Sequence, residues 1–374
     1  MRCILISLLV LTTLSGLPAQ RVCYKCKGEG SVVCKKKDHD QKRTCGKWKF
    51  EHKCSSLFSA PCCRGTLQVH CERCNDPVAE AKIMERVEGR ASWVKQHKDL
   101  LGRAGIKGVT VETDNFRVHF MIPRWSANEA RLTRNRAAHL FAYRLQKAAD
   151  RFHEICGTTP GLRQTLTMCK DAKENLSFTL NHMGGGYQVP FRRSAAAGLV
   201  CTWPIPQQPW DLKNDENMHS HVVHLGTHLM HWASLKFHLQ TVVWLDVGLC
   251  HWMELDQTKQ TRNFCFNEGA AKDLWMDADW KKKIYSEVGG KSEVTFAALL
   301  TKKNLDQTDH RDHAYCWSFV DYLVAAHPEK FKKFYREMKL QNDTKKALDR
   351  VFNISTASFH DQWRNWVRKN YAPQ

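Results

Sequence analysis

Histidines recur at helical spacing between residues 219 and 235, where the chain reads HSHVVHLGTHLMHWASL. At about 100° per residue, four of them fall on one narrow face of a single helix, namely His221, His224, His228 and His231. Two histidines at positions i and i+4 of a helical face can bind zinc, and in zinc-dependent hydrolysis a glutamate beside the first histidine activates the bound water. The segment therefore predicts a metal-binding helix with His224 and His228 as its ligand pair.

A second motif, WLDVGLCHWME, begins at Trp244, and 18 residues separate His228 from Val247 within it. This frame resembles the gluzincin metallopeptidases of the peptidase MA-like kind, in which HExxH is followed after eighteen residues by a glutamate in a WLxEGLA motif on a second helix. The resemblance covers residues 108–372, from the segment VETDNFRV to the C-terminal segments AYCWSFVDYL and WRNW. It implies an α+β metallopeptidase-like fold with a small mixed sheet, an active-site helix and a C-terminal helical subdomain.

Two departures from this family concern the chemistry itself. Leu225 stands where the resemblance implies the general-base glutamate, and Val247 stands where it implies the third metal ligand. Leucine cannot accept a proton from metal-bound water, and valine has no lone pair to give to zinc. We therefore expect no catalytic residue at either position, and a vestigial zinc helix in which His224 and His228 alone form a weak metal site.

The sequence leaves two interpretations of this histidine helix open. His251 and Glu254 lie four and seven residues after Val247 on the same helical face, so an active zinc hydrolase could use one of them as the third ligand. Imidazole ligands would favour a late transition metal. In the other interpretation the histidines pack in or around an inactive cleft. Another nucleophile is not evident, because the chain has no GxSxG motif and the sequence assigns no base to Cys250 or Cys316.

A cysteine-rich segment precedes this domain. It opens with CYKCKGEG, which contains Cys23 and Cys26, and closes with CERC, which contains Cys71 and Cys74. Two CxxC pairs supply four thiolates in the tetrahedral arrangement that structural zinc prefers, and glycines after the first pair relieve the sharp turn around a metal. The pattern resembles the cysteine-rich zinc domain of DnaJ-type chaperones. This resemblance implies that Cys23, Cys26, Cys71 and Cys74 form its outer zinc site.

The inner elements of such a zinc domain are incomplete in this chain. Cys34 and Cys63 are present and could contribute to a second metal site, but Lys37 and Ala60 stand where their CxxC partners belong. The other thiols of the segment are Cys45, Cys54 and Cys62. The sequence does not decide between zinc and disulfides for these five cysteines. The pairing of the six later cysteines, at positions 156, 169, 201, 250, 265 and 316, also stays open.

The opening stretch MRCILISLLVLTTLSGLPAQ has one arginine, then an apolar run, then small residues that end near Ala19. This pattern predicts a signal peptide over residues 1–19, and therefore an exported protein that is secreted or resides in the periplasm or cell envelope. Behind it we expect a zinc-binding module over residues 20–75, a linker helix over 76–107 and the gluzincin-like domain over 108–374. We expect no transmembrane segment after removal of the signal.

Hydrophobic periodicity predicts the elements of the larger domain. We expect a strand at 110–122, a long helix at 126–156, a strand at 162–168 and an irregular or short-stranded segment at 184–210. From His219 onward the chain should be almost entirely helical. Strands that come first and helices that come later indicate an α+β domain.

The formal net charge of +19 makes the surface basic, and residues 21–75 alone hold thirteen Lys or Arg against five Asp or Glu. A basic surface attracts polyanions. Export argues against nucleic acid, so acidic envelope polymers are the polyanionic partners that we expect. The sequence thus predicts an exported zinc-binding protein whose degenerate metallopeptidase-like domain binds protein or peptide. An active hydrolase with rearranged ligands and a purely structural envelope protein are the alternatives.

Overall fold

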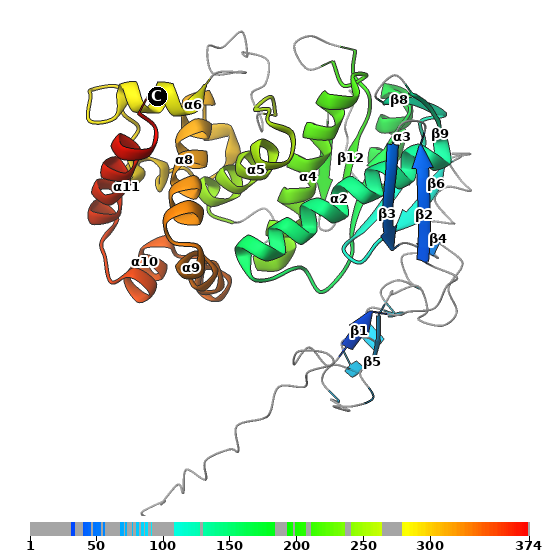
Figure 1. Cartoon of the computed structure of the whole chain (residues 1–374), viewed down its shortest axis with the longest axis horizontal. Coiled ribbons are helices and arrows are strands. Elements are labelled where there is room, and N and C mark those ends of the chain that lie inside the picture. Colours follow the sequence, from blue (N-terminus) through cyan, green and yellow to red (C-terminus); the bar gives the residue numbers. More distant parts are fainter. Residues whose placement is uncertain are drawn as a thin grey trace, which may run out of the picture.

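The computed structural model describes residues 108–372, except for 128–129, 184–192, 197–198, 207–210, 236–240 and 264–278. Nearer the N-terminus it describes five short strands and isolated positions between 72 and 91. The described chain has the mixed α+β composition that the sequence predicts (Figure 1). Among the described helices, none combines the length and the apolar character that crossing a membrane requires.

A six-stranded mixed sheet forms one side of the large domain, with strand order β11-β12-β10-β7-β6-β4. In chain order its strands are β4 (Ser55–Ser56), β6 (Val109–Glu112), β7 (Phe116–Phe120), β10 (Gln164–Met168), β11 (Arg193–Ala196) and β12 (Leu199–Thr202). β10 runs parallel to β7 and β12, and the other pairings are antiparallel. Every residue of β7 and β10 is buried, as expected of central strands covered on both faces.

The prediction of a single strand at 110–122 is wrong, because this segment forms the antiparallel hairpin of β6 and β7. The chain turns at residues 113–115, where the Thr113 amide donates to the Phe116 carbonyl at 2.8 Å. Asp114 and Asn115 occupy this turn, and both residue types favour turns because their side chains can bond to nearby backbone.

The long helix begins later than predicted. Residues 124–133 form a separate hairpin of β8 (Arg124–Ala127) and β9 (Ala130–Thr133), and only then does α2 (Arg134–Cys156) start. Thr133 caps α2 by accepting a hydrogen bond from the Arg136 amide, and the helix ends at Gly157, whose φ of 71° suits glycine. Periodicity placed the C-terminal end correctly, but it did not detect the alternating buried and exposed residues of β8.

The remaining expectations for this domain hold more closely. The strand expected at 162–168 is β10, and β11 and β12 are the short strands of the segment 184–210. Helix α3 (Ala172–Met183) was not predicted. The described residues from Asp215 onward are mostly helical, as expected: α4 (Asp215–Leu235), α5 (Val243–Thr258), α6 (Trp280–Glu287), α7 (Phe296–Leu299), η4 (Leu305–Gln307), α8 (His310–Ala326), α9 (Pro328–Gln341), α10 (Thr344–Phe352) and α11 (Thr356–Asn370).

The predicted cysteine-rich module is described only in its strands. β1 (Ser31–Val33) pairs with β5 (Gln68–His70), and β2 (Asp40–Cys45) pairs with β3 (Trp48–Lys53) in a hairpin that lies beside α2. β4 adds an edge strand to the large sheet by pairing with β6, so this part of the segment joins the larger domain. The described positions of the expected linker helix, such as Glu80 and Met84, are helical.

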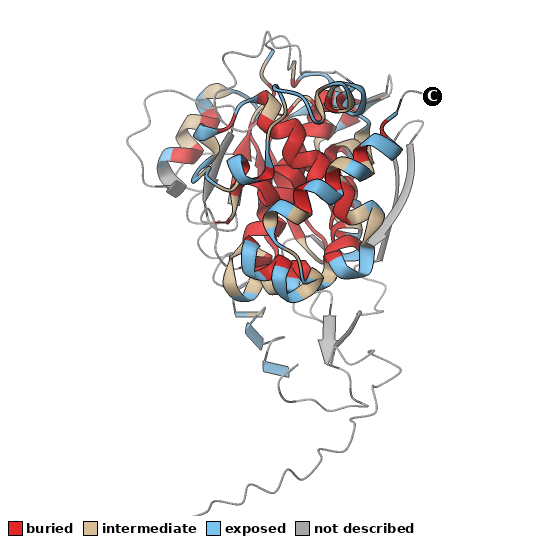
Figure 2. Cartoon of the chain, turned by 90° about the vertical axis from the view of Figure 1, so that its left-hand side faces the viewer, coloured by how far each residue is buried: buried red, intermediate tan, exposed pale blue. Residues whose placement is uncertain are grey.

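Helix α4 lies at the centre of the domain. It packs against α2 on one side and against α5 on the other, and α8 covers the far side of α5 (Figure 1). Buried residues are concentrated in the middle of the domain (Figure 2). Two glycines allow these close approaches, since a Cβ on Gly226 would meet the Leu145 side chain at 2.6 Å and a Cβ on Gly248 would overlap the Cys316 carbonyl oxygen. Close packing on both sides therefore fixes the faces that α4 and α5 turn toward each other.

Candidate metal centre

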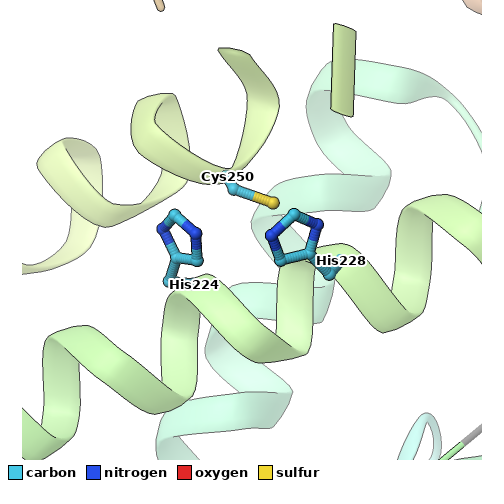
Figure 3. A group of neighbouring side chains, drawn as sticks. All are labelled: His224, His228 and Cys250. Atoms are coloured by element: carbon cyan, nitrogen blue, oxygen red, sulfur yellow. The ribbon is translucent and has the colours of Figure 1, made fainter. Parts of the chain in front are cut away.

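Two imidazoles and a thiol converge between α4 and α5. His224 and His228 project from α4, and Cys250 projects from α5 toward them (Figure 3). One ligand atom from each of the three residues lies within 4.8 Å of the other two. All three side chains are buried, with at most 2% of their surface exposed. Tetrahedral zinc would hold such atoms about 3.3 to 3.7 Å apart, so small side-chain rotations would complete the site.

Each of these histidines is held by a carboxylate through its Nδ1 atom. His224 Nδ1 lies 3.0 Å from Glu254 Oε2, and His228 Nδ1 lies 2.8 Å from Asp246 Oδ1. A carboxylate can only accept, so Nδ1 carries the proton and Nε2 is the nitrogen that could bind a metal. Metal-binding histidines commonly donate their other N–H to a carboxylate, which fixes the tautomer and orients the ring.

The surroundings of the Asp246 carboxylate favour its ionised form. Burial acts to raise its pKa, but the neighbouring His228 lowers it, and the resulting pKa lies below the ordinary value. Its second oxygen accepts a hydrogen bond from Trp232 Nε1 at 2.8 Å. Asp246 therefore acts as a fixed negative acceptor behind His228.

The Glu254 carboxylate occupies the corresponding place behind His224. Its Oε1 accepts hydrogen bonds from Ser220 Oγ at 2.7 Å and from Asn263 Nδ2 at 2.8 Å, while its Oε2 lies 3.1 Å from His251 Nδ1. His251, Glu254 and His224 thus also form a group that could hold a metal ion. Hydrogen bonds explain why these three side chains lie close together, because His224 Nδ1 and His251 Nδ1 both contact Glu254 Oε2. Glu254 therefore orients the His224 ring, and His251 helps to hold Glu254 in place.

This arrangement bears on the two alternatives for a third ligand, His251 and Glu254. The structure brings both residues to His224, but the group that includes both His224 and His228 has Cys250 as its third member. The other ring nitrogen of His251 contacts α8 instead, because its Nε2 lies 2.8 Å from Nδ1 of His313.

The two positions that lack the expected peptidase residues lie in the hydrophobic core. Leu225 is 1% exposed and Val247 is 0% exposed. Val247 is on the helix that faces His224 and His228, as the motif spacing predicts, and its neighbour Asp246 contacts His228 directly. An aliphatic side chain at either position can supply neither a metal ligand nor a base.

Sequence reasoning missed Cys250 as a candidate ligand. Val247 and Cys250 are three residues apart on α5, so they share one helical face, and a thiolate one turn further along can reach the position that Val247 cannot serve. The helical spacing from the failed position was the signal that could have identified it. The sequence analysis considered His251 and Glu254 instead, because they lie four and seven residues after Val247.

The cysteines of the predicted outer zinc site, Cys23, Cys26, Cys71 and Cys74, lie outside the described residues. The same holds for Cys34, Cys54, Cys62 and Cys63, and for the side chain of Cys45. The chain matches no model of a known protein family, and no curated protein matches it. Functional inference therefore rests on the chemistry of the site itself.

Proposed function

We propose that this chain is an exported metal-binding protein that holds one zinc ion between α4 and α5 and does not hydrolyse peptides. The observation that carries the proposal is the convergence of His224, His228 and Cys250, with a carboxylate behind each histidine. A third protein ligand changes the expectation for the histidine helix, since two imidazoles alone hold a metal weakly and three ligands are the usual protein contribution to an open zinc site.

The donor set supports zinc over the hard cations. Two imidazoles and one thiolate suit late transition metals, whereas calcium and magnesium require oxygen ligands. Zinc would accept His₂Cys as three corners of a tetrahedron and leave a fourth position for water or another ligand. When bound, the ion would act as a Lewis acid at that fourth position.

The residues around the centre argue against peptide hydrolysis. The resemblance implies a general base at position 225, where the chain has a buried leucine. The two carboxylates that contact this histidine pair, Asp246 and Glu254, are each engaged by a histidine. Absence of the general base typically costs about 10² to 10⁴ in rate. The site therefore keeps its means of binding a metal but lacks the group that would activate a bound water.

The test is the metal content of the purified full-length protein. We expect the Cys250→Ser variant to contain one zinc per chain less than the wild type, because serine is a poor zinc ligand at neutral pH. Cys156→Ser is the matched control, since Cys156 is also buried but lies at the end of α2. Equal metal content in wild type and Cys250→Ser would overturn the proposal.

Hydrolysis is tested separately with the zinc-loaded protein and a mixture of unstructured peptides. We expect no cleavage by the wild type. Cleavage that disappears in His228→Ala would show that this centre is catalytic and would contradict the second half of the proposal.

A further inference from the structure

Two cysteines meet on the opposite face of the sheet from the helix pair described above. Cys169 directly follows β10, and Cys201 lies in the adjacent parallel strand β12. Their Sγ atoms are 3.5 Å apart, and the Cys169 amide donates to the Thr202 carbonyl at 2.8 Å. Backbone pairing therefore holds the two thiols side by side.

The surroundings of this pair form a small cluster of their own. Cys169 and Cys201 are both 0% exposed and pack with Met121 and Phe178, separately from the main core. Phe178 belongs to α3, which covers this end of the sheet. Asn175, also on α3, donates from Nδ2 to the Cys201 sulfur at 3.2 Å.

We propose that Cys169 and Cys201 form a disulfide bond in the mature protein. Each thiol loses one hydrogen, a sulfur–sulfur bond forms between them, and a disulfide-containing oxidant such as oxidised glutathione accepts the two electrons and becomes two thiols. The sulfur atoms must approach by about 1.5 Å to reach a bond length of about 2.05 Å. This inference goes beyond the proposed function, since neither cysteine belongs to the metal centre.

A disulfide at this location would stabilise a part of the fold that has little hydrophobic packing of its own. The small cluster beneath α3 buries few side chains, so it contributes little apolar burial compared with the main core. A bond across the 32-residue separation of the two cysteines would close a loop that contains α3 and β11. Closing a loop of this length restricts the unfolded chain and thereby stabilises the fold.

Burial also determines when the bond can form. Burial and the neighbouring Cys201 thiol raise the pKa of Cys169, so the native pair is a poor target for an external oxidant. The bond must therefore form during folding, while the strands pair and α3 has not yet covered them.

Oxidative refolding tests the proposal. The full-length chain, unfolded and reduced, is refolded with zinc in a mixture of reduced and oxidised glutathione, and the remaining thiols are alkylated under denaturing conditions. Peptide mapping should then recover a cross-linked peptide pair that contains Cys169 and Cys201, while Cys156 and Cys316 are alkylated. Alkylation of both Cys169 and Cys201 without prior reduction would overturn the proposal.

Thermal unfolding provides a second measurement. Reductant should lower the melting temperature of the refolded wild type by about 5 to 10 °C more than that of Cys201→Ala, because only the wild type has this bond to lose. Cys201→Ala should keep its metal content, so failure of this inference leaves the proposed function intact. An equal effect of reductant on both proteins would contradict the disulfide.

Discussion

Helix α4 carries two pairs of histidines that look alike in the sequence but differ in what surrounds them. In the inner pair, His224 and His228 each donate to a carboxylate. In the outer pair, His221 Nδ1 lies 2.9 Å from Asn263 Oδ1 and its Nε2 lies 3.0 Å from Thr202 Oγ1, while His231 Nδ1 lies 3.0 Å from the Tyr335 hydroxyl. All four are buried to nearly the same degree.

The difference suggests a rule for this helix: the hydrogen-bond partner, and not the helical face, distinguishes the histidines proposed to bind metal from those that only pack in the core. A carboxylate partner fixes the Nδ1–H tautomer and makes the opposite nitrogen a better donor to a metal. The outer histidines have neutral partners instead: at His221 these occupy both ring nitrogens, and at His231 the partner is a hydroxyl that can donate or accept. Among the described residues, the group that could hold a metal and contains both His224 and His228 also contains Cys250, and the proposed zinc site therefore uses the inner pair.

Alanine replacements should produce the largest difference between the two pairs, measured as the change in zinc affinity. Zinc sites contribute about 10 to 16 kcal/mol of binding free energy from four ligands, so His228→Ala should weaken zinc binding by about 10² to 10³-fold. His221→Ala should leave zinc affinity unchanged, although it removes a buried ring. Competition with a chelator measures both, and equal losses in the two variants would break the distinction between the pairs.

A glutamate beside the inner pair should harm folding more than it helps chemistry. Leu225 is part of the hydrophobic core, so Leu225→Glu should lower the free energy of unfolding by at least about 3 kcal/mol through an unpaired buried charge. Leu225→Met is the control, with an expected loss below about 1.5 kcal/mol. Urea denaturation compares them. Wild-type stability in Leu225→Glu would mean that position 225 opens into a solvated cleft.

The partners of the two pairs can be compared directly. Asp246→Asn replaces the acceptor behind His228 with a neutral group of the same shape and should weaken zinc binding by about 10 to 100-fold. Tyr335→Phe removes the partner of the outer His231 and should not change zinc affinity. Isothermal titration of the metal-free proteins provides both values, and an effect of Tyr335→Phe equal to that of Asp246→Asn would contradict the comparison.

His231 of the outer pair should appear in the pH dependence of stability. Burial lowers the pKa of His231 to about 4, from an ordinary value near 6.5. Between these values the unfolded state binds the proton and the folded state does not, so stability is full above about pH 6.5 and declines as the pH falls toward 4. At pH 5 the loss from this group is about 2 kcal/mol. Denaturation at pH 7 and pH 5 should show a smaller difference for His231→Gln than for wild type.

The sequence predicted much of the frame of this site. The i, i+4 histidines and the 18-residue interval placed α4 against the helix that carries Val247, because helical periodicity and spacing are local properties of the chain. The helical C-terminal region followed from the same periodicity. The β6–β7 and β8–β9 hairpins were missed, since short turns and brief alternation were overridden by the longer pattern around them.

The chemistry of the site depended on contacts that the sequence does not encode locally. Asp246 could be seen beside Val247, but its pairing with His228 results from the packing of two helices. The role of Glu254 as the acceptor behind His224 likewise depends on Ser220 and Asn263, which only the fold brings to it. Cys250 was dismissed as a lone cysteine because its neighbours in space were unknown.

The most direct test of the central claim is a crystal structure of the zinc-loaded full-length protein with anomalous data collected on both sides of the zinc absorption edge. The account predicts a zinc peak between α4 and α5, about 2.0 to 2.1 Å from His224 Nε2 and His228 Nε2 and about 2.3 Å from Cys250 Sγ. A loaded protein with no zinc peak between these three residues, or with zinc bound instead by His251 and Glu254, would contradict it.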